Sequence, residues 1–187
     1  PVWDEITELA EKKGVKIKLV EFTDYNQPNE ALQNGEIDVN AFQHKYFLSN
    51  WNKENDGTIV EVADTFLSPI RLFSGTKNNG DAKYTDVVDI PDKATISVPN
   101  DASNESRALY LLQSAGLIKL DVSGNELATI KNISSNPKNL DIKEVDAAQT
   151  ASTLNSVDAA VINNSYAQSA NVNYDTTLYT EPIDDNS

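Results

Sequence analysis

The feature that most constrains this chain is an alternation of helical and strand-like hydrophobic periods along its 187 residues. Val2, Ile6 and Leu9 recur at helical spacing, and Gly14 ends that pattern. Apolar residues then alternate with lysines over 15–19 in a segment that continues to residue 22, which is typical of a strand. A chain that repeats this order favours an α/β fold in which helices cover largely parallel sheets.

The same signals place the remaining elements and divide the chain. Helices are predicted over 27–34, 44–53, 103–115 and 147–154, and strands over 37–39, 59–62, 69–73, 94–98, 142–145 and 159–162. Residues 75–86 are polar and rich in Asn and Gly, which predicts a surface loop. The break near this loop indicates two lobes. We expect lobe I at 1–75, lobe II at 76–170, and a return towards lobe I at 171–187.

Charge and cysteine content exclude several classes of function. The 15 basic and 29 acidic residues give a formal net charge of −14, so we expect no nucleic-acid partner. The chain has no cysteine, which excludes disulfides, thiolate metal ligands and cysteine nucleophiles.

No apolar run approaches the roughly 18 residues of a membrane-spanning helix. No export signal precedes the first helix pattern, so if the protein is exported, we expect that segment to have been removed.

Polar and aromatic residues gather where the predicted strands end. Ligands of open α/β sheets bind beyond the carboxyl ends of the strands. Four sets of residues follow predicted strands, and amides, aromatic rings and single charges of this kind can orient a small zwitterion. The sets are Asp24, Tyr25, Asn26 and Asn29; Asn40, Phe42, Gln43 and His44; Asn100, Asp101, Asn104 and Arg107; and Asn163 and Asn164.

Arg107 is the sharpest candidate for a ligand contact. It lies in the first turn of a predicted helix, where a guanidinium and free backbone N–H groups together bind a carboxylate strongly. The alternative is a surface salt bridge with Glu105 or Asp101. Asn163 follows a buried apolar strand, so its amide needs either a backbone partner or a ligand. Tyr25 and Phe66 suit either the core or the walls of a ligand site.

His44 is the only histidine in the chain, and it favours a binding wall over catalysis. General-base catalysis requires a nucleophile or a positioned water and an orienting group. The sequence contains no nucleophile-elbow serine, no second histidine for a typical zinc site and no phosphate-binding glycine loop. We therefore expect no catalytic residue, no metal and no cofactor.

Several of these stretches resemble the methionine-binding lipoproteins of the NlpA/MetQ family. The similarity runs in order along nearly the whole chain. It is carried by residues 20–32 (VEFTDYNQPNEAL), 35–44 (GEIDVNAFQH), 99–109 (PNDASNESRAL), 115–120 (AGLIKL) and 158–163 (DAAVIN).

The resemblance implies a two-lobed periplasmic-binding-protein-like (type II) fold that closes on L-methionine, D-methionine or a short methionine-like peptide. It also implies an extracytoplasmic, lipid-anchored monomer that serves the membrane permease of an ABC importer and is not an enzyme. The arginine that grips the ligand carboxylate matches Arg107. The other matched positions that line the cleft are His44, Asn163, Tyr25, Phe42 and Phe66, with Asn100 and Asn104 as weaker matches.

Three departures from the family pattern limit that expectation. Residues 44–48 read HKYFL where the family has His-x-Pro-Tyr-Leu, so a tyrosine contact is lost or moved to Tyr46. Arg71 stands where glycine is expected, which puts side-chain specificity in doubt. Both ends fall short of the family pattern, and the lipid anchor is missing, so we expect a piece of a longer protein. Binding of another small amino acid, a surface adhesin and an enzyme on a similar scaffold remain as alternatives.

Overall fold

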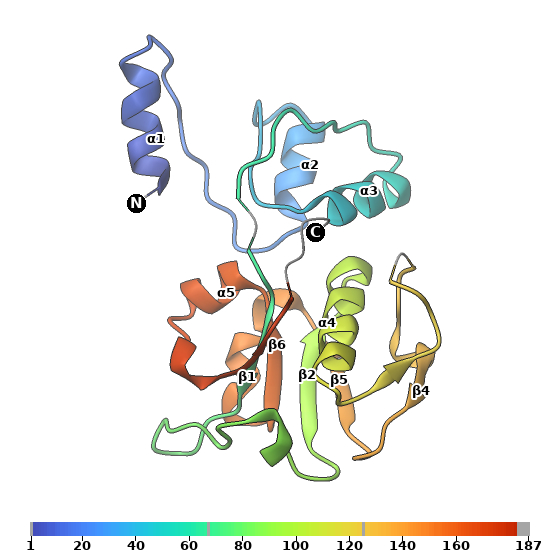
Figure 1. Ribbon diagram of the computed structural model, residues 1–187. Helices are drawn as coiled ribbons and strands as arrows, with labels where there is room; N and C mark the ends of the chain where they lie inside the picture. The colour runs from blue at the N-terminus through green and yellow to red at the C-terminus, as the bar shows by residue number, and fades with distance from the viewer. Residues whose placement is uncertain (1, 67, 125, 183–187) are drawn as a thin grey trace.

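One five-stranded sheet organises the C-terminal part of the chain. A computed structural model describes residues 2–66, 68–124 and 126–182 (Figure 1). Within them the strands lie in the order β5-β2-β6-β1-β7. Their bounds are β1 (Arg71–Ser74), β2 (Thr95–Pro99), β5 (Asp141–Val145), β6 (Ala159–Ile162) and β7 (Thr177–Thr180).

β1 is the one described strand of this sheet that is antiparallel to the others. β2 pairs in parallel with β5 and β6, whereas β1 pairs antiparallel with β6 and β7. The carboxyl ends of β2, β5, β6 and β7 therefore meet at one edge, together with the amino end of β1. The predicted parallel arrangement holds for β2, β5 and β6. β1 departs from it because the chain enters the sheet at that edge, coming from the N-terminal half (Figure 1).

Apolar side chains alternate across the sheet and form a core on each face. Leu72 and Val161 pack on one side with Leu109 of the long helix α4. Phe73 and Ile162, one residue further along each strand, pack on the other side. This side is covered by α5 and by short 3₁₀ helices. The bounds are α4 (Ala102–Ser114), α5 (Asn164–Ser169), η3 (Ala147–Gln149) and η4 (Ala151–Asn155).

The helix predicted over 147–154 is wrong in type, because hydroxyl groups compete for its backbone carbonyls. Thr150 Oγ1 donates to Ala147 O at 2.8 Å, and Thr153 Oγ1 donates to Thr150 O at 2.7 Å. Ser152 forms the same bond over three residues. Bonds of this spacing accompany tight 3₁₀ turns, and the segment folds as η3 and η4.

A short hairpin and several turns complete the C-terminal part. β3 (Lys119–Leu120) pairs antiparallel with β4 (Ile133–Ser135) outside the main sheet. The predicted loop 75–86 contains a single isolated bridge, Thr76 to Ala82, among the residues described. The remaining 3₁₀ turns are η1 (Val87–Asp89), η2 (Ile130–Asn132) and η5 (Tyr174–Thr176).

The N-terminal half contains the predicted helices without the predicted strands. Its helices are α1 (Val2–Glu11), α2 (Gln27–Gln33) and α3 (Lys45–Glu54), and α3 buries Phe47, Leu48 and Trp51. The segments 15–22, 37–39 and 59–62 are not strands, because they form no backbone ladder with the described part of the chain. α1 stands apart from the rest of the fold and buries none of its residues (Figure 1).

The two halves meet above the edge where β2 and β6 end, since α3 packs against α4. β1 and β7 both belong to the sheet of the C-terminal part. The division into lobes at 1–75, 76–170 and 171–187 stays a prediction.

Candidate functional site

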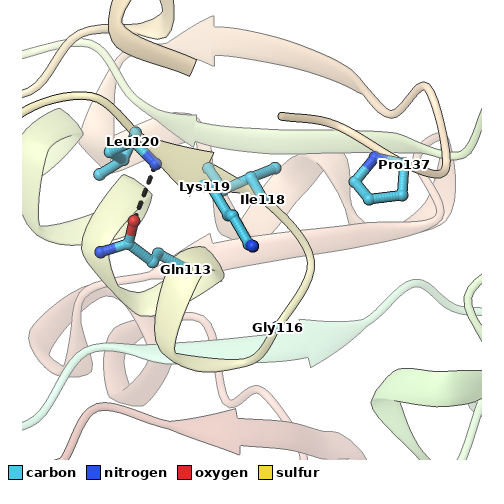
Figure 2. A pocket seen from close by; sticks show the side chains of 6 residues that line it. All are labelled: Gln113, Gly116, Ile118, Lys119, Leu120 and Pro137. Carbon is cyan, nitrogen blue, oxygen red and sulfur yellow. Dashed lines mark hydrogen bonds between the residues drawn. The ribbon is translucent and has the colours of Figure 1, made fainter. Parts of the chain in front are cut away.

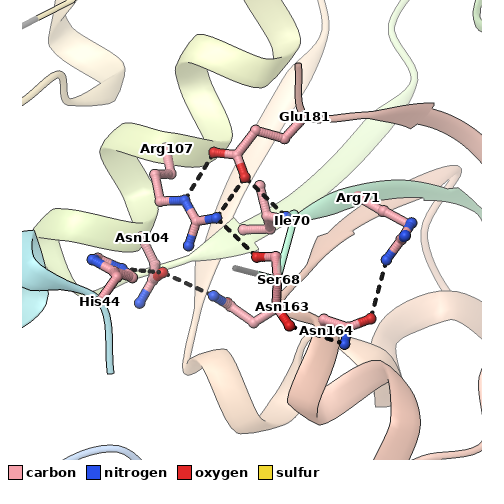
Figure 3. A network of polar contacts seen from close by, with 9 residues as sticks. All are labelled: His44, Ser68, Ile70, Arg71, Asn104, Arg107, Asn163, Asn164 and Glu181. Carbon is pink, nitrogen blue, oxygen red and sulfur yellow. Dashed lines mark hydrogen bonds and ion pairs between the residues drawn. The ribbon is translucent and has the colours of Figure 1, made fainter. Parts of the chain in front are cut away.

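The candidate site lies at the edge of the sheet where four strands end. α4 starts just after β2, with Asp101 as its N-cap, and this places Asn104 and Arg107 on its first two turns. Asn163 directly follows β6. His44 reaches the same place from the other half, as the N-cap of α3. The site therefore combines side chains from both halves of the chain (Figure 3).

A chain of hydrogen bonds fixes the orientation of three of these side chains. The Asp101 carboxylate accepts a bond from Asn104 Nδ2 at 2.9 Å, so the other atom of that amide, Oδ1, faces the site. Asn104 Oδ1 accepts from Asn163 Nδ2 at 2.8 Å and lies 3.2 Å from His44 Nε2. His44 Nδ1 accepts from the Phe47 N–H at 3.1 Å, so Nε2 carries the imidazole proton and donates to Asn104.

Burial keeps His44 in this neutral form. Removal from water lowers the pKa of His44, and the positive charge of Arg107 lowers it further, although the bond to Asn104 acts in the opposite direction. The uncharged imidazole therefore acts as a fixed hydrogen-bond donor to Asn104 within the site.

Asn163 carries a buried acceptor that no part of the described chain satisfies. Its side chain is 6% exposed, and its Oδ1 atom has no hydrogen-bond partner among the described residues. The amide cannot turn over to relieve this, because Nδ2 is needed opposite Asn104 Oδ1. An unpaired buried carbonyl costs about 1–3 kcal/mol. The site therefore offers one acceptor to a ligand that brings an N–H or O–H group.

Arg107 is held by a carboxylate that the sequence did not indicate. Its Nε donates to Glu181 Oε1 at 2.9 Å, and its Nη2 donates to the other oxygen of that carboxylate and to Ser68 O. Neither Glu105 nor Asp101, the partners considered from the sequence, forms this ion pair. Arg107 thus forms a salt bridge, as one interpretation of the sequence proposed, but with a residue 74 positions away. Its side chain also faces the shared site (Figure 3).

Aromatic rings from both halves form an apolar wall beside these polar groups. The Tyr25 ring lies 5.8 Å from Phe42 and 4.5 Å from Tyr166 of α5, between ring centroids. Phe47 lies 5.9 Å from both Tyr25 and Phe42. The Tyr25 hydroxyl bonds to Ser165, and burial raises the pKa of Tyr25 to about 12. The wall joins the two halves and stays uncharged at neutral pH.

A buried cluster of amides holds the loop that presents this wall. Asn29 is fully buried and exchanges hydrogen bonds with Gln43 at 2.8 Å in both directions. Asn40 adds a bond to Asn29 Oδ1 at 2.9 Å. Phe42 and His44 flank Gln43 in sequence, so this cluster positions both of them.

Three predicted site residues lie outside this constellation. Phe66 is 73% exposed and Tyr46 is 67% exposed, although the Tyr46 ring lies 6.4 Å from that of His44. Asn100 is exposed directly after β2 and forms no side-chain hydrogen bond with the described residues of the site. Their role in binding stays a prediction, as does that of the residues the structure brings together, namely Tyr25, Phe42, His44, Asn104, Arg107 and Asn163.

Arg71, the unexpected cation near the crossover, points to α5. Its Nη1 donates to Asn164 Oδ1 at 3.0 Å, and its guanidinium lies 5.1 Å from the centre of the Tyr174 ring. The Tyr174 hydroxyl donates to the same Asn164 oxygen at 2.7 Å. Arg71 is thus held beside the site by groups other than the Arg107 network (Figure 3).

A separate pocket of about 370 Å³ lies at the far end of α4. Figure 2 shows it between the end of α4 and β3, where Gln113 Oε1 accepts the Leu120 N–H at 2.8 Å. It shares no residue with the constellation around Arg107. Its lining is Gln113, Gly116, Ile118, Lys119, Leu120 and Pro137.

The described residues contain neither a cluster of metal ligands nor a membrane-spanning helix. No group of three or more His, Cys, Asp or Glu side chains is placed to hold a metal ion in residues 2–66, 68–124 and 126–182. Within the same residues, helices that combine the length and apolarity of a bilayer-spanning segment are absent.

Sequence reasoning missed Glu181, Ser68 and Tyr166. Glu181 directly follows β7, so it obeys the same rule as the predicted residues. The signal was the run of β-branched, apolar and aromatic residues from Thr177 to Thr180, which favours a strand; this strand, β7, is one of the four that end at this edge.

Comparison with known proteins gives consistent relatives for the whole chain. A family model described as NlpA lipoprotein matches residues 1–187. A probable D-methionine-binding lipoprotein MetQ of Pasteurella multocida (strain Pm70) is 42% identical over 168 residues, which are 87% of this chain and 58% of that protein. The chain therefore spans less than two thirds of that curated relative.

Two solved structures show the same fold. The substrate-binding protein of a methionine transporter from Streptococcus pneumoniae is 60% identical, with a TM-score of 0.93 over 97% of this chain and 70% of that one. A nutrient-binding protein from Burkholderia cenocepacia bound to methionine is 41% identical, with a TM-score of 0.89 over 97% of this chain and 75% of that one. The mixed α/β class and the resemblance noted in the sequence are thereby confirmed.

Proposed function

The chain belongs to the NlpA lipoprotein family, and from that premise we propose that it is the ligand-binding part of an ABC importer for methionine or a closely related amino acid. A small zwitterion is caught between the two halves of the chain, and the protein binds it without changing it. The related proteins whose names mention methionine support this ligand class.

The observation that carries the proposal is the orphan acceptor Asn163 Oδ1 in a site that also contains Arg107. The ammonium of an amino acid supplies the N–H that Asn163 lacks, and its carboxylate approaches the guanidinium. The neutral imidazole of His44 donates its one N–H to Asn104 Oδ1 and so holds the amides of the site in place. Donors and an acceptor at one place match both charged groups of a zwitterion.

The aromatic wall supports an apolar ligand side chain. Phe47 packs edge to face against Tyr25 and Phe42 beside the polar groups, and rings of this kind bury a thioether or alkyl chain well. A ligand that touches Tyr25 and His44 on one half and Arg107 and Asn163 on the other stabilises the closed form, because only that form makes all these contacts.

Partners and location follow from the same family. We infer that the protein acts outside the cytoplasm, tethered by a lipid, that it delivers its ligand to a membrane permease, and that it works as a monomer without nucleic acid. The lipoprotein names of its relatives support the tether.

A calorimetric panel tests the proposed ligand. L-methionine, D-methionine, a methionine-containing dipeptide, leucine and glutamate are titrated into the protein, and thermal melting is recorded with each. A ligand at 100 times its Kd adds about 2.7 kcal/mol of stability, which corresponds to a rise in Tm of roughly 5–10 °C for a chain of this size. We expect this rise with methionine or its dipeptide. Absence of a rise with every amino acid in the panel contradicts the proposal.

The two arginines of the chain provide a matched pair of variants. Arg107→Lys keeps the charge and the pairing with Glu181 but removes the planar fork, so we expect methionine affinity to fall at least tenfold, about 1.4 kcal/mol. Arg71→Lys makes the same chemical change beside Asn164 and Tyr174, and we expect it to leave affinity within about threefold. Equal losses of methionine affinity in the two variants would mean that Arg107 is not the residue that binds the ligand carboxylate.

A further inference from the structure

Only one nitrogen of the Arg107 guanidinium, Nη1, is left available to a ligand by the described residues. The edge formed by Nε and Nη2 is taken by both oxygens of Glu181, and Nη2 also reaches Ser68 O at 3.3 Å. Nη1 donates to no residue within the described ranges. In Figure 3 this free nitrogen lies on the side of Asn104, away from Glu181. A ligand therefore meets an arginine whose bidentate edge is already occupied.

Glu181 is anchored too firmly to act as a loose stand-in for the ligand carboxylate. Its Oε2 accepts the Ile70 N–H at 3.0 Å in addition to the bond from Arg107, and its own N–H donates to Ile70 O at 3.0 Å. The side chain is 22% exposed. Swinging it out would leave Ile70 N–H and two guanidinium N–H groups without their acceptors, which is more than one ligand carboxylate replaces.

The charges of the pair cancel at the place where the ligand binds. A simple carboxylate that approaches Nη1 is attracted by Arg107 and repelled by Glu181, so its net gain is small. A zwitterion brings an ammonium as well, which is attracted by Glu181 and is needed by Asn163 Oδ1. A partly buried anion beside the cation therefore discriminates against ligands that carry only the negative charge.

We propose that Glu181 is a positioning and specificity residue of the ligand site. It holds Arg107 by one edge, leaves Nη1 for the ligand carboxylate, and makes the site select zwitterionic amino acids over simple carboxylates. This inference rests on the proposed function.

The test compares methionine with 4-(methylthio)butanoate, the same molecule without its amino group. Calorimetry gives the dissociation constants of both ligands for the wild type and for Glu181→Gln. The Kd of 4-(methylthio)butanoate divided by the Kd of methionine measures the selection for a zwitterion. We expect Glu181→Gln to lower this ratio at least tenfold, because the monocarboxylate gains from an uncompensated Arg107 while methionine loses the anchored arginine. A residue that only supports the fold would weaken both ligands by the same factor and leave the ratio unchanged.

Two further variants complete the design. Glu126→Gln removes another carboxylate that accepts a backbone N–H, at Ser123, and we expect both constants to stay at their wild-type values. Glu181→Asp keeps the charge but withdraws it from Arg107, so we expect both affinities to fall at least threefold with the ratio retained. It also serves if Glu181→Gln does not fold.

The outcomes separate the two proposals. Wild-type protein that binds neither methionine nor its relatives overturns the proposed function and this inference with it. Wild-type protein that binds methionine, with an unchanged ratio in Glu181→Gln or unchanged methionine affinity in Glu181→Asp, overturns the role of Glu181 alone.

Discussion

Replacement of Asn163 by leucine should separate ligand binding from folding. The side chain is buried, donates one hydrogen bond to Asn104 and leaves its Oδ1 atom unpaired. Leucine has nearly the same length and brings no polar atom. Asn163 is also the N-cap of α5 without forming a side-chain cap, so no helix cap is lost.

The two energy terms have opposite signs. The lost bond to Asn104 costs about 0.5–1.5 kcal/mol, whereas removal of the orphan acceptor relieves about 1–3 kcal/mol. Asn104 Oδ1 keeps its bond from His44, so no new unsatisfied atom appears. We expect the ligand-free variant to gain about 1 kcal/mol, which raises Tm by roughly 2–4 °C. Binding of methionine should fall at least tenfold, because the ammonium loses its acceptor.

Thermal melting with and without ligand measures both effects in one experiment. Asn136→Leu serves as the control, because both ends of that amide are bonded, to Leu140 O and to Leu140 N–H, each at 2.9 Å. We expect it to lower Tm without affecting the ligand-induced rise. A clear loss of stability in ligand-free Asn163→Leu would refute the reasoning, since it would mean that Oδ1 is satisfied in solution.

Three further predictions concern titration and packing. Burial lowers the pKa of His44 below its unfolded value of 6.5. The contribution of His44 to stability is therefore complete above pH 6.5 and is lost as the pH falls below that value. We expect His44→Asn to reduce the dependence of Tm on pH in this acidic range. Burial raises the pKa of Glu105, which is 5% exposed and faces Glu144, so its contribution to stability is present below the unfolded value of 4.5 and is lost as pH rises. Glu105→Gln should raise Tm at pH 7, and equal melting temperatures there would contradict this. A Cβ at Gly75 would lie 2.2 Å from a backbone oxygen before β6, so Gly75→Ala should cost about 1–3 kcal/mol in chemical denaturation, whereas Gly124→Ala meets nothing within 4 Å and should melt as the wild type does.

Local signals in the sequence were sufficient for helices α1 to α4 and for strands β1, β2, β5 and β6. The helix at α1 is marked by its apolar period and its terminal glycine, and α4 by its apolar period and by Gly116, which ends it. The strand 159–162 was predicted from an uninterrupted apolar run and is β6. Such features depend on residues a few positions apart, which is the range over which periodicity carries information.

Features that depend on distant partners could not be predicted in the same way. Alternation over 15–22 indicates which side chains share a face, but a strand also requires a neighbour for its backbone, and none is present in the described residues. The same applies to the site. Asn163 was expected to need a backbone partner or a ligand, but its Nδ2 bonds the side chain of Asn104. The carboxylate of Arg107 comes from Glu181, 74 residues away. Only the sheet order brings β7 next to β1 and so brings these two residues together.

The extended stretch 16–20 has a consequence for the behaviour of this 187-residue chain at high concentration. Its backbone N–H and C=O groups have no ladder partner in the described part of the chain, and Leu19 and Val20 are exposed. A segment of this kind can accept another extended chain and thereby start intermolecular β-sheet growth. Lys16 and Lys18 oppose this process, because a second copy aligned on the segment brings like charges close together. Neutralising these two lysines should therefore accelerate aggregation without any change at the ligand site.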